Sequence, residues 1–336
     1  MMNELRPLVV IPAELEYYGA LPGLLEGAGF SVRQAGDRGA LASIISETDV
    51  LLTSVFLGVD RELLLQARRL RGVVSLIIGV DNVDVAACTE LGLIVANGPV
   101  PENPVGTAEA TVLLLVALLK RLRSKEIAVR SGQWRPDSGP GHQVWRKTIG
   151  IVGVGRIGRA VAQRLQGWDV TLLGTSRHLT QATAPSGMSA VKLDELLAES
   201  DVVSIHAALT PETRGLIGAR ELALMKPTAY LVNTARGGIV DELALADAIR
   251  TDRLAGGAID VWPEEPPPPD HPLFTLPPDR VILTGHNLGH SVELMPAMMT
   301  AAVENVTRVA RGEPPVYMVN PEVLHAWRER LAALAH

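Results

Sequence analysis

The chain has 336 residues, of which 47% are hydrophobic and 20% are charged, so it is long enough for two domains with buried cores. Its formal net charge of −6 gives no long-range attraction for nucleic acid or an anionic membrane, and no metal-binding spacing is visible. The single cysteine, Cys88, excludes an internal disulfide framework. Residues 1–15 lack a signal-peptide pattern, and the longest apolar run, 110–119, is about half a membrane span. We therefore expect a cytoplasmic protein.

Short apolar runs alternate with helical patterns over the first hundred residues. The runs that predict buried strands are residues 7–12, 49–54, 73–79 and 93–97. Residues 21–30 predict a helix between the first two strands. This alternation predicts a parallel sheet with helices on both faces, as a first domain over residues 1–101.

A connector and a long helix follow the first domain. The proline-rich stretch 97–104, "NGPVPENP", is predicted to be the connector. One continuous helix is expected from residue 107 to about residue 130, apolar at its start and basic at its end.

A second α/β run begins at residue 148. The strands predicted from its apolar runs are residues 148–155, 169–174, 201–207, 228–235, 256–261 and 280–286. The second domain is expected over residues 102–288. The helical patterns after it should return to the first domain, which residues 289–336 would complete.

A glycine-rich turn opens this second run. Gly153, Gly155 and Gly158 fit the pattern G-x-G-x-x-G, with Arg156 and Ile157 between the last two glycines. The turn follows an apolar strand and begins a helix, so its backbone can approach a pyrophosphate at the helix N-terminus. The motif predicts dinucleotide binding by these five residues, and the alternative is a purely structural turn.

The end of the next strand lacks the acidic residue that a site for NAD usually carries. That acid binds the ribose 2′-hydroxyl and would repel the 2′-phosphate of NADP. Here Ser176 and Arg177 occupy the position, and a hydroxyl with a guanidinium suits a phosphate ester. The sequence therefore favours NADP over NAD. The alternative is that Arg177 points to solvent and the site is unselective.

Two long motifs resemble the D-isomer-specific 2-hydroxyacid dehydrogenase family. They are "GVDNVDVAACTELGLIVANGP" at 79–99 and "LVNTARGGIVDELALADAIRTDRLAGGAIDVWPEEP" at 231–266, and the resemblance runs from about residue 50 to 325. It implies an α/β fold of two Rossmann-like domains, a flavodoxin-like substrate domain and a doubly wound dinucleotide-binding domain, with the active site in the cleft. It also implies a homodimer through residues 107–134.

The family implies roles for three residues. Hydride transfer to a 2-oxo acid needs a cation for the carboxylate and carbonyl, an acid for the oxygen and a positioned nicotinamide. By resemblance, Arg236 is the cation, His286 is the acid/base and Glu265 is the carboxylate that favours the imidazolium. Glu264 is the rival for that last role. Further positions that line the cofactor site in relatives are Thr107, His206, Thr234 and Asp260.

At two places the sequence departs from the family pattern, so the family's residue roles do not carry over there. The first-domain substrate loop usually reads Gly-x-Gly, whereas this chain has Ile77, Ile78 and Gly79. We expect Ile78 and Gly79 to contact substrate. Phosphite dehydrogenase also lacks the first glycine, but it has a lysine where this chain has Ile78. At position 290, relatives have a small residue and this chain has His290. We expect this histidine either to act as a second titrating group or only to fill space at the start of a helix.

The leading interpretation is an NAD(P)-dependent reductase of a small 2-oxo acid that favours NADPH and uses no metal. A second interpretation is a dehydrogenase for a phosphorus oxyanion or phosphonate. A third is a dinucleotide-sensing, corepressor-like interaction protein, which keeps the same Arg, Glu and His. The sequence does not identify the acid.

Overall fold

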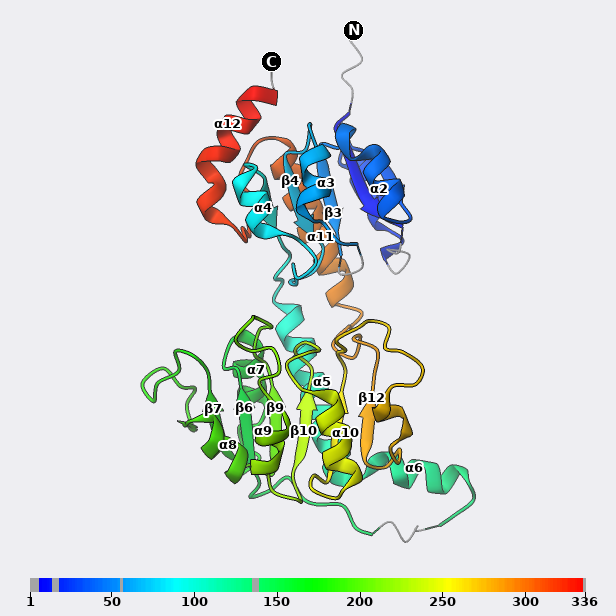
Figure 1. The fold of residues 1–336 in the computed structure, drawn as a ribbon, viewed down its shortest axis with the longest axis vertical. Coiled ribbons are helices and arrows are strands. Elements are labelled where there is room, and N and C mark those ends of the chain that lie inside the picture. Colours follow the sequence, from blue (N-terminus) through cyan, green and yellow to red (C-terminus); the bar gives the residue numbers. More distant parts are fainter. Residues whose placement is uncertain (1–5, 14–17, 55–56, 135–138, 335–336) are drawn as a thin grey trace. The chain divides into compact units, whose positions relative to one another are not determined.

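The computed structural model describes residues 6–13, 18–54, 57–134 and 139–334. Residues 1–5, on which part of the signal-peptide expectation depends, lie outside that description. The chain divides into two compact units (Figure 1). Unit 1 comprises Met1–Glu102 and Ser291–His336, and unit 2 comprises Asn103–His290.

Unit 1 contains a parallel five-stranded sheet in the order β2-β1-β3-β4-β5, the flavodoxin-like order. Its strands are β1 (Leu8–Pro12), β2 (Ser31–Ala35), β3 (Val50–Thr53), β4 (Gly72–Ser75) and β5 (Ile94–Ala96). The sequence prediction missed β2. This strand lies at the edge of the sheet and buries only Ala35, so it lacks a buried strand's apolar run.

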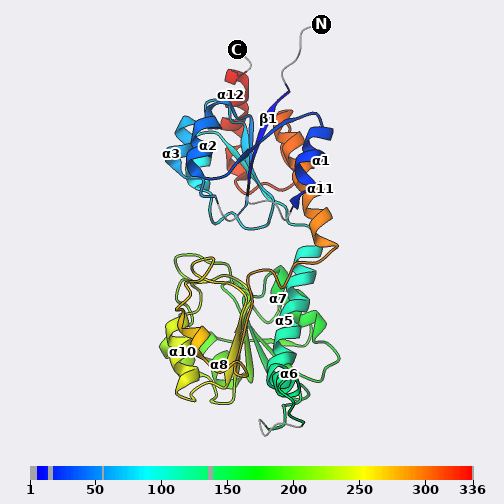
Figure 2. The ribbon, with the colours of Figure 1, turned by 90° about the vertical axis from the view of Figure 1, so that its right-hand side faces the viewer.

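Helices cover both faces of this sheet, as predicted (Figure 2). The helices are α1 (Leu21–Gly27), α2 (Arg38–Ile44), α3 (Arg61–Gln66), α4 (Val85–Glu90), α11 (Leu294–Ala310) and α12 (Leu324–Leu334), with 3₁₀ turns η2 (Ile45–Glu47) and η4 (Pro321–Val323). An aspartate accepts a backbone N–H at the start of α2, α3 and α4.

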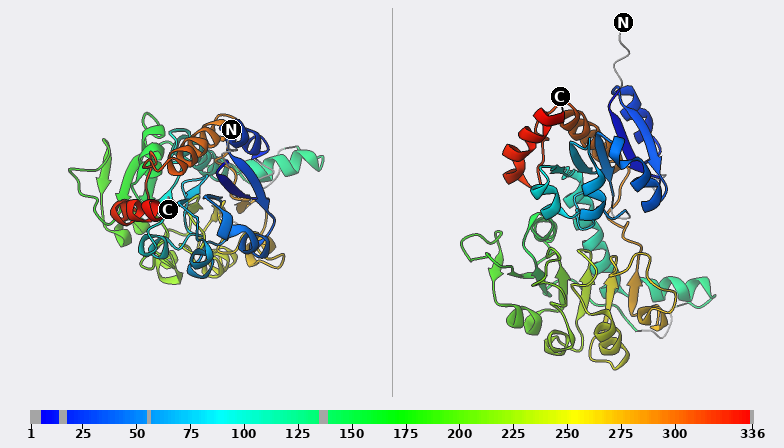
Figure 3. Two further views of the ribbon diagram at one scale, coloured as in Figure 1. Left: turned by 90° about the horizontal axis from the view of Figure 1, so that it is seen from above. Right: turned by 45° about the horizontal axis from the view of Figure 1, so that its top comes forward.

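The C-terminal helices pack in unit 1 (Figure 3). Trp327 of α12 is fully buried, and its indole Nε1 donates to the Arg71 carbonyl oxygen at 2.6 Å. Leu294, Met298 and Val306 of α11 lie in the same core as β1 and β3. The end of the chain therefore completes the core that its beginning starts.

Unit 2 contains a parallel seven-stranded sheet in the order β12-β11-β10-β9-β6-β7-β8. Its strands are β6 (Thr148–Val152), β7 (Thr171–Thr175), β8 (Met188–Ala190), β9 (Val202–Ile205), β10 (Tyr230–Asn233), β11 (Gly256–Ile259) and β12 (Val281–Leu283). The strand order reverses between β6 and β9. Ligands of doubly wound sheets bind at such a switch point, beyond the carboxyl ends of the strands.

Helices flank this sheet as well (Figure 2). They are α5 (Glu102–Lys120), α6 (Leu122–Arg130), α7 (Arg156–Arg164), α8 (Leu193–Glu199), α9 (Ala219–Leu224) and α10 (Glu242–Arg250), with the 3₁₀ turn η3 (Pro272–Thr275). By length and composition α5 could span a membrane. A core helix passes the same test, and Leu114, Leu115, Leu118 and Leu119 of α5 pack in the core of unit 2.

The prediction of one continuous helix over 107–130 is wrong. The structure has two helices, α5 and α6, separated at Arg121, whose backbone is left-handed with φ 52°. The Arg121 guanidinium Nη2 lies 3.1 Å from Asp279 Oδ2. No glycine or proline marks the break, and the partner is 158 residues away, so a local pattern could not indicate it.

Candidate active site

Two of the three glycines in the glycine-rich turn are required by packing, and the third is not. Gly153 has φ 96°, and a Cβ there would lie 2.3 Å from the Ala207 nitrogen. A Cβ at Gly158 would lie 2.2 Å from the Gly153 carbonyl oxygen. Both positions therefore need glycine for packing. A Cβ at Gly155 would meet no atom within 4 Å, so packing does not require glycine there.

The open space beside Gly155 faces the start of α7. Gly155 is the N-cap residue of this nine-residue helix, and it offers no side chain to the first N–H groups. Arg156 is exposed and Ile157 is half-buried. Free N–H groups and a close backbone approach suit a pyrophosphate, so the turn fits a dinucleotide. Packing within the chain does not require the glycine at 155, whereas the close approach of a ligand would.

The end of β7 is exposed, and it carries a contact that sequence reasoning missed. Arg177 Nη2 lies 3.4 Å from Glu212 Oε2, and both side chains are about two-thirds exposed, at 65% and 66%. Ser176 beside it is exposed. The Thr210 hydroxyl donates to Glu212 Oε2 at 2.7 Å, and this bond holds the pKa of Glu212 below its ordinary value. An acid thus lies near this strand end, but it comes from the loop after β9.

Two polar side chains lie at the ends of the central strands. His206 Nε2 is 2.8 Å from the Ser204 hydroxyl, and burial lowers the pKa of His206 to about 3, which keeps the ring neutral. Its Nδ1 is buried and has no partner among the described residues. Thr234 follows β10 and shares a 2.8 Å hydroxyl contact with Thr111 of α5.

Thr107 on α5 lies against the segment after β12. Its hydroxyl donates to the Asn103 carbonyl oxygen at 3.0 Å. A Cβ at Gly289 would lie 2.9 Å from the Thr107 hydroxyl oxygen, so Gly289 permits this close approach. Thr107 is therefore near the segment that carries His286.

Arg236 lies in a hydrogen-bonded turn after β10. The Asn233 side chain is fully buried, accepts the Ala235 N–H at 3.1 Å and donates to the Arg236 carbonyl oxygen at 3.0 Å. Arg236 Nη1 donates to the Ala235 carbonyl oxygen at 2.8 Å. Asn233 was missed by sequence reasoning, although a polar residue that ends a buried strand is a usable signal.

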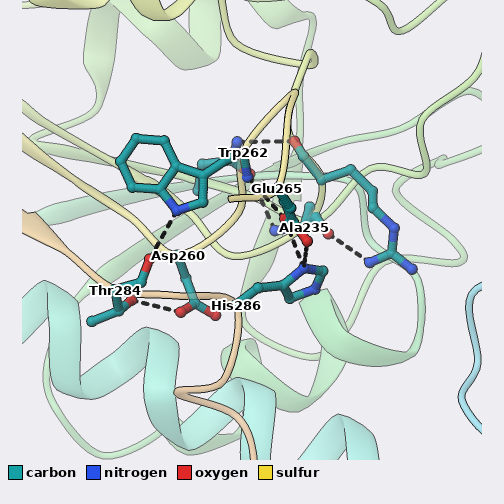
Figure 4. A network of polar contacts seen from close by, with 8 residues as sticks. Ala235, Asp260, Trp262, Glu265, Thr284 and His286 are labelled. Atoms are coloured by element: carbon teal, nitrogen blue, oxygen red, sulfur yellow. Dashed lines mark hydrogen bonds and ion pairs between the residues drawn. The ribbon is translucent and has the colours of Figure 1, made fainter. Parts of the chain in front are cut away.

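His286 and Glu265 form a close carboxylate–imidazole pair (Figure 4). His286 Nδ1 lies 2.8 Å from Glu265 Oε1 and 2.9 Å from Oε2. Burial raises the pKa of Glu265, but hydrogen bonds from His286 and Trp262 and the charges of His286 and Arg236 together hold the net pKa below the ordinary value. The rival Glu264 is exposed. Because Nδ1 faces the carboxylate, Nε2 is left for another partner.

The backbone of His286 is held in an uncommon conformation. His286 has φ 55°, which a residue other than glycine rarely adopts. Its N–H donates to the Asp260 carbonyl oxygen at 2.6 Å, and the Asp260 carboxylate accepts the Thr284 hydroxyl at 2.5 Å. Strain of this kind persists where neighbouring contacts over-determine it, often at functional sites.

Trp262 connects the two strands that carry this pair (Figure 4). Its backbone N–H donates to Glu265 Oε1 at 3.1 Å, and its indole Nε1 donates to the Thr284 carbonyl oxygen at 2.9 Å. Both Trp262 and Thr284 were missed by sequence reasoning, because their roles depend on contacts across β11 and β12. The unit thus brings Asp260, Glu265 and His286 into one network.

The predicted substrate loop of unit 1 has its carbonyl groups occupied. The Asn97 amide donates to the Ile78 carbonyl oxygen at 2.8 Å, and the Ser75 hydroxyl donates to that of Gly79 at 2.7 Å. The Gly98 N–H donates to the Ile77 carbonyl oxygen at 3.2 Å. These contacts fix the orientation of the peptide groups at 77–79.

His290 lies four residues after His286, and its residue surface is partly exposed. Its N–H donates to the Asn287 carbonyl oxygen at 3.0 Å. Partial burial, followed by the charge of His286, holds the pKa of His290 below its ordinary value. Both interpretations of His290 stay open. Within the described ranges, no group of three His, Cys, Asp or Glu side chains is arranged to hold a metal ion.

Residues 112–287 match the family model described as the D-isomer specific 2-hydroxyacid dehydrogenase, NAD binding domain. A glyoxylate reductase of Thermofilum pendens is 39% identical over 286 residues, which are 83% of this chain and 84% of that protein. A D-3-phosphoglycerate dehydrogenase of Methanocaldococcus jannaschii is 36% identical over 82% of this chain and 52% of its own length.

Solved structures agree with this likeness. A D-lactate dehydrogenase from Aquifex aeolicus, complexed with NAD and lactic acid, superimposes with a TM-score of 0.84 at 26% identity, over 93% of this chain and 98% of that one. The TT0316 protein of Thermus thermophilus gives 0.82 at 32% identity, over 93% and 99%. The chain belongs to the D-isomer specific 2-hydroxyacid dehydrogenase family, whose members are oxidoreductases with a nicotinamide cofactor.

Proposed function

We propose that this protein reduces a small 2-oxo acid to the 2-hydroxy acid, with NADPH preferred over NADH. The observation that carries the proposal is the His286–Glu265 pair, with Nδ1 and Oε1 2.8 Å apart, in the same unit as Arg236 and the glycine-rich turn. The three catalytic groups follow strands of one parallel sheet, whose carboxyl ends meet at one edge.

Each residue has one task in this mechanism. When bound, the reduced nicotinamide supplies the hydride that the substrate C2 receives. The Arg236 guanidinium binds the carboxylate and polarises the carbonyl. His286 Nε2–H gives its proton to the carbonyl oxygen as negative charge develops there, and Glu265 stabilises the imidazolium before that transfer. In the oxidative direction His286 accepts the same proton.

The two units are proposed to divide the binding tasks. The glycine-rich turn, with His206, Thr234 and Asp260, serves the cofactor in unit 2. The peptide N–H groups of Ile78 and Gly79 in unit 1 contact the substrate carboxylate. Support comes from the hydrogen bonds that Ser75 and Asn97 donate to the carbonyl groups of this loop, because they fix the orientation of its peptide groups.

The preference for NADPH rests on Ser176 and Arg177. A hydroxyl and a guanidinium at the end of β7 suit a 2′-phosphate. Glu212 acts against it, because the carboxylate contacts Arg177 and would repel the phosphate. We therefore expect a modest preference that depends on release of Arg177 from Glu212.

A homodimer through residues 107–134 is also proposed. Large apolar side chains are exposed along this region, which is unusual for surface that stays in water. They are Leu113 at 53%, Leu122 at 54%, Ile127 at 41%, Val129 at 58% and Trp134 at 80%. Sedimentation of the wild type and of Val129→Glu tests the proposal, because a dimer should dissociate in the variant.

A cytoplasmic location is proposed as well. It fits the single cysteine, Cys88, which is free and buried, because a reducing compartment keeps thiols unpaired.

A substrate panel tests the proposed reaction. Initial rates would be measured by NADPH and NADH absorbance with glyoxylate, hydroxypyruvate, pyruvate and larger 2-oxo acids. Phosphite with NADP⁺ and with NAD⁺ tests the phosphorus-oxyanion alternative in the same assay. Saturable reduction of a 2-oxo acid supports the proposal. Turnover with phosphite alone would contradict it, and no turnover with any compound would favour a dinucleotide-sensing role.

A further inference from the structure

A second carboxylate–imidazole pair lies outside the catalytic residues of unit 2. Glu242, the first residue of α10, and His271, which caps η3, approach to 2.8 Å between Oε2 and Nε2. Their side chains are only 4% and 11% exposed, against 27% and 32% for Glu265 and His286. Unlike the catalytic pair, this pair has little access to a substrate.

The hydrogen positions follow from the neighbours. The Leu273 N–H donates to His271 Nδ1 at 3.3 Å, so the hydrogen of the neutral ring is on Nε2, which faces Glu242. Burial raises the pKa of Glu242 to about 7, helped by the charge of Asp241. Burial lowers the pKa of His271, and Asp270 opposes that shift. The charges that act on the pair are thus two acidic neighbours.

The Glu242–His271 pair is not expected to stabilise the fold. Neither oxygen of Glu242 has an aligned hydrogen-bond donor among the described residues, and a buried polar group without one costs free energy. The His271 ring packs edge-on against Trp262, with centroids 5.2 Å apart and planes at 83°.

Trp262 carries this contact to the catalytic pair. Its N–H donates to Glu265 Oε1 at 3.1 Å, and the same Oε1 lies 2.8 Å from His286 Nδ1. Phe274 of η3 packs on Trp262 and His271 with centroids 5.6 Å from each. A continuous set of contacts therefore runs from Glu242 through His271 and Trp262 to Glu265.

We propose that Glu242 and His271 are positioning residues for catalysis. They fix the segment 262–271 so that the Glu265 carboxylate stays on His286 Nδ1. The inference rests on the proposed role of His286. Neither residue touches substrate or cofactor in this mechanism, and their effect on turnover passes through Glu265.

The first test compares Glu242→Leu with Glu242→Gln. Leucine removes the polar contact, whereas glutamine keeps an oxygen near His271 and removes only the charge. Glu242→Leu should lower kcat for glyoxylate reduction by roughly 10- to 100-fold, the cost of a misplaced catalytic group. Its pH–rate profile should move to lower pH, as in Glu265→Gln. Glu242→Gln should restore most of the turnover and the profile.

The matched control is Leu243→Ala, the next residue of α10, whose side chain is 66% exposed. It should leave both kcat and the profile unchanged. A double-mutant cycle tests whether the effect passes through Glu265. In a Glu265→Gln background, Glu242→Leu should lower kcat by less than about 2-fold. An equal loss in both backgrounds, or a pH profile that does not move, would overturn the proposal.

A measurement without turnover separates this inference from the proposed function. The imidazole signals of His286 are followed by NMR during a pH titration of the wild type and of His271→Gln. The variant should show an altered His286 titration while its circular dichroism is unchanged. An unaltered titration in a folded variant would overturn the positioning role, even if His286 proves catalytic. Conversely, an altered His286 titration would support the contact between the two pairs even if His286→Asn kept its turnover.

Discussion

In unit 2, the proposed reaction end around His286 and the proposed adenosine end around Arg177 differ in how firmly their side chains are held. At the reaction end, Asp260, Glu265 and His286 are linked by contacts of 2.5 to 3.1 Å, and Asp260 is only 5% exposed. At the proposed adenosine end, Arg177 pairs with Glu212 at 3.4 Å and its side chain is 65% exposed. Exposed ion pairs of this kind contribute little to the free energy of folding. The fold therefore holds the reaction end firmly, whereas Ser176 and Arg177, which we propose to select the cofactor, are exposed.

The largest expected effect is at the centre of the reaction end. His286→Asn should lower turnover by about 100- to 10,000-fold, because it removes the group that transfers the proton. Cofactor affinity should change little, since the glycine-rich turn is untouched. Rates at saturating substrate and fluorescence titration with NADPH measure the two quantities. Near-wild-type turnover would remove His286 from the mechanism.

Arg236→Lys should follow in size. An ammonium cannot reproduce the two-pronged contact of a guanidinium with a carboxylate, so kcat/KM should fall roughly 10- to 150-fold. The matched control is Arg220→Lys, an exposed arginine of α9 paired with Asp194 at 3.0 Å, which should have no effect. Equal kinetics in the two variants would show that Arg236 does not bind substrate.

Glu265→Gln should be milder and should show in the pH dependence. Burial raises the pKa of Glu265, but its contacts with His286 and Trp262 and the charge of Arg236 together hold it below the ordinary value, so the carboxylate beside His286 is charged. Without it, the pH–rate profile of reduction should shift downward, with a loss of roughly 10-fold near neutral pH. Glu264→Gln is the control, and a shift in that variant instead would reassign the partner.

At the adenosine end the changes should redistribute cofactor preference. Arg177→Ala should reduce kcat/KM for NADPH by roughly 10-fold, the low end for a charge-assisted contact, because the site is exposed and Glu212 competes. NADH should be nearly unaffected. Ser176→Asp should reverse the preference by repelling the 2′-phosphate and accepting the 2′-hydroxyl.

Glu212→Gln sharpens this prediction. It should raise kcat/KM for NADPH a few-fold by releasing Arg177, and added salt should weaken NADPH binding more than NADH binding. A wild type that already prefers NADH, or an equal loss with both cofactors in Arg177→Ala, would show that Arg177 is only a surface residue.

The smallest effect is expected in the stability of the positioning pair. Burial raises the folded-state pKa of Glu242 to about 7, above the ordinary value of 4.5. Its contribution to stability is thus complete at acidic pH and is lost as the pH rises through about 7. Glu242→Gln should remove this loss. The Tm of the variant minus the Tm of the wild type should therefore be larger at alkaline pH than at acidic pH. A constant difference in Tm would contradict the assigned shift.

Local sequence predicted those parts of the molecule that repeat a pattern along the chain. Strand, turn and helix around Gly153 follow from apolar runs and glycine spacing. Edge strands such as β2 and β8 lack that pattern and were missed. The family motif placed Glu265 and Glu264 as rivals, and the fold brings only Glu265 to His286.

Contacts over long sequence separations could not be predicted in this way. Glu212 reaches Arg177 from 35 residues away, and Asn233 holds Arg236 through its backbone. Glu242 approaches His271 only because α10 packs on η3. In each case the partner is selected by the packing of strands and helices, so a single sequence holds no local signal for it.

The most direct test of the account compares kcat/KM with NADPH and with NADH in two variants side by side. His286→Asn should lose the same large factor with both cofactors, because both deliver hydride to the same proton-dependent step. Arg177→Ala should lose activity with NADPH alone. A cofactor-dependent loss in His286→Asn, or a loss with both cofactors in Arg177→Ala, would contradict the separation between the end that performs the chemistry and the end that chooses the cofactor.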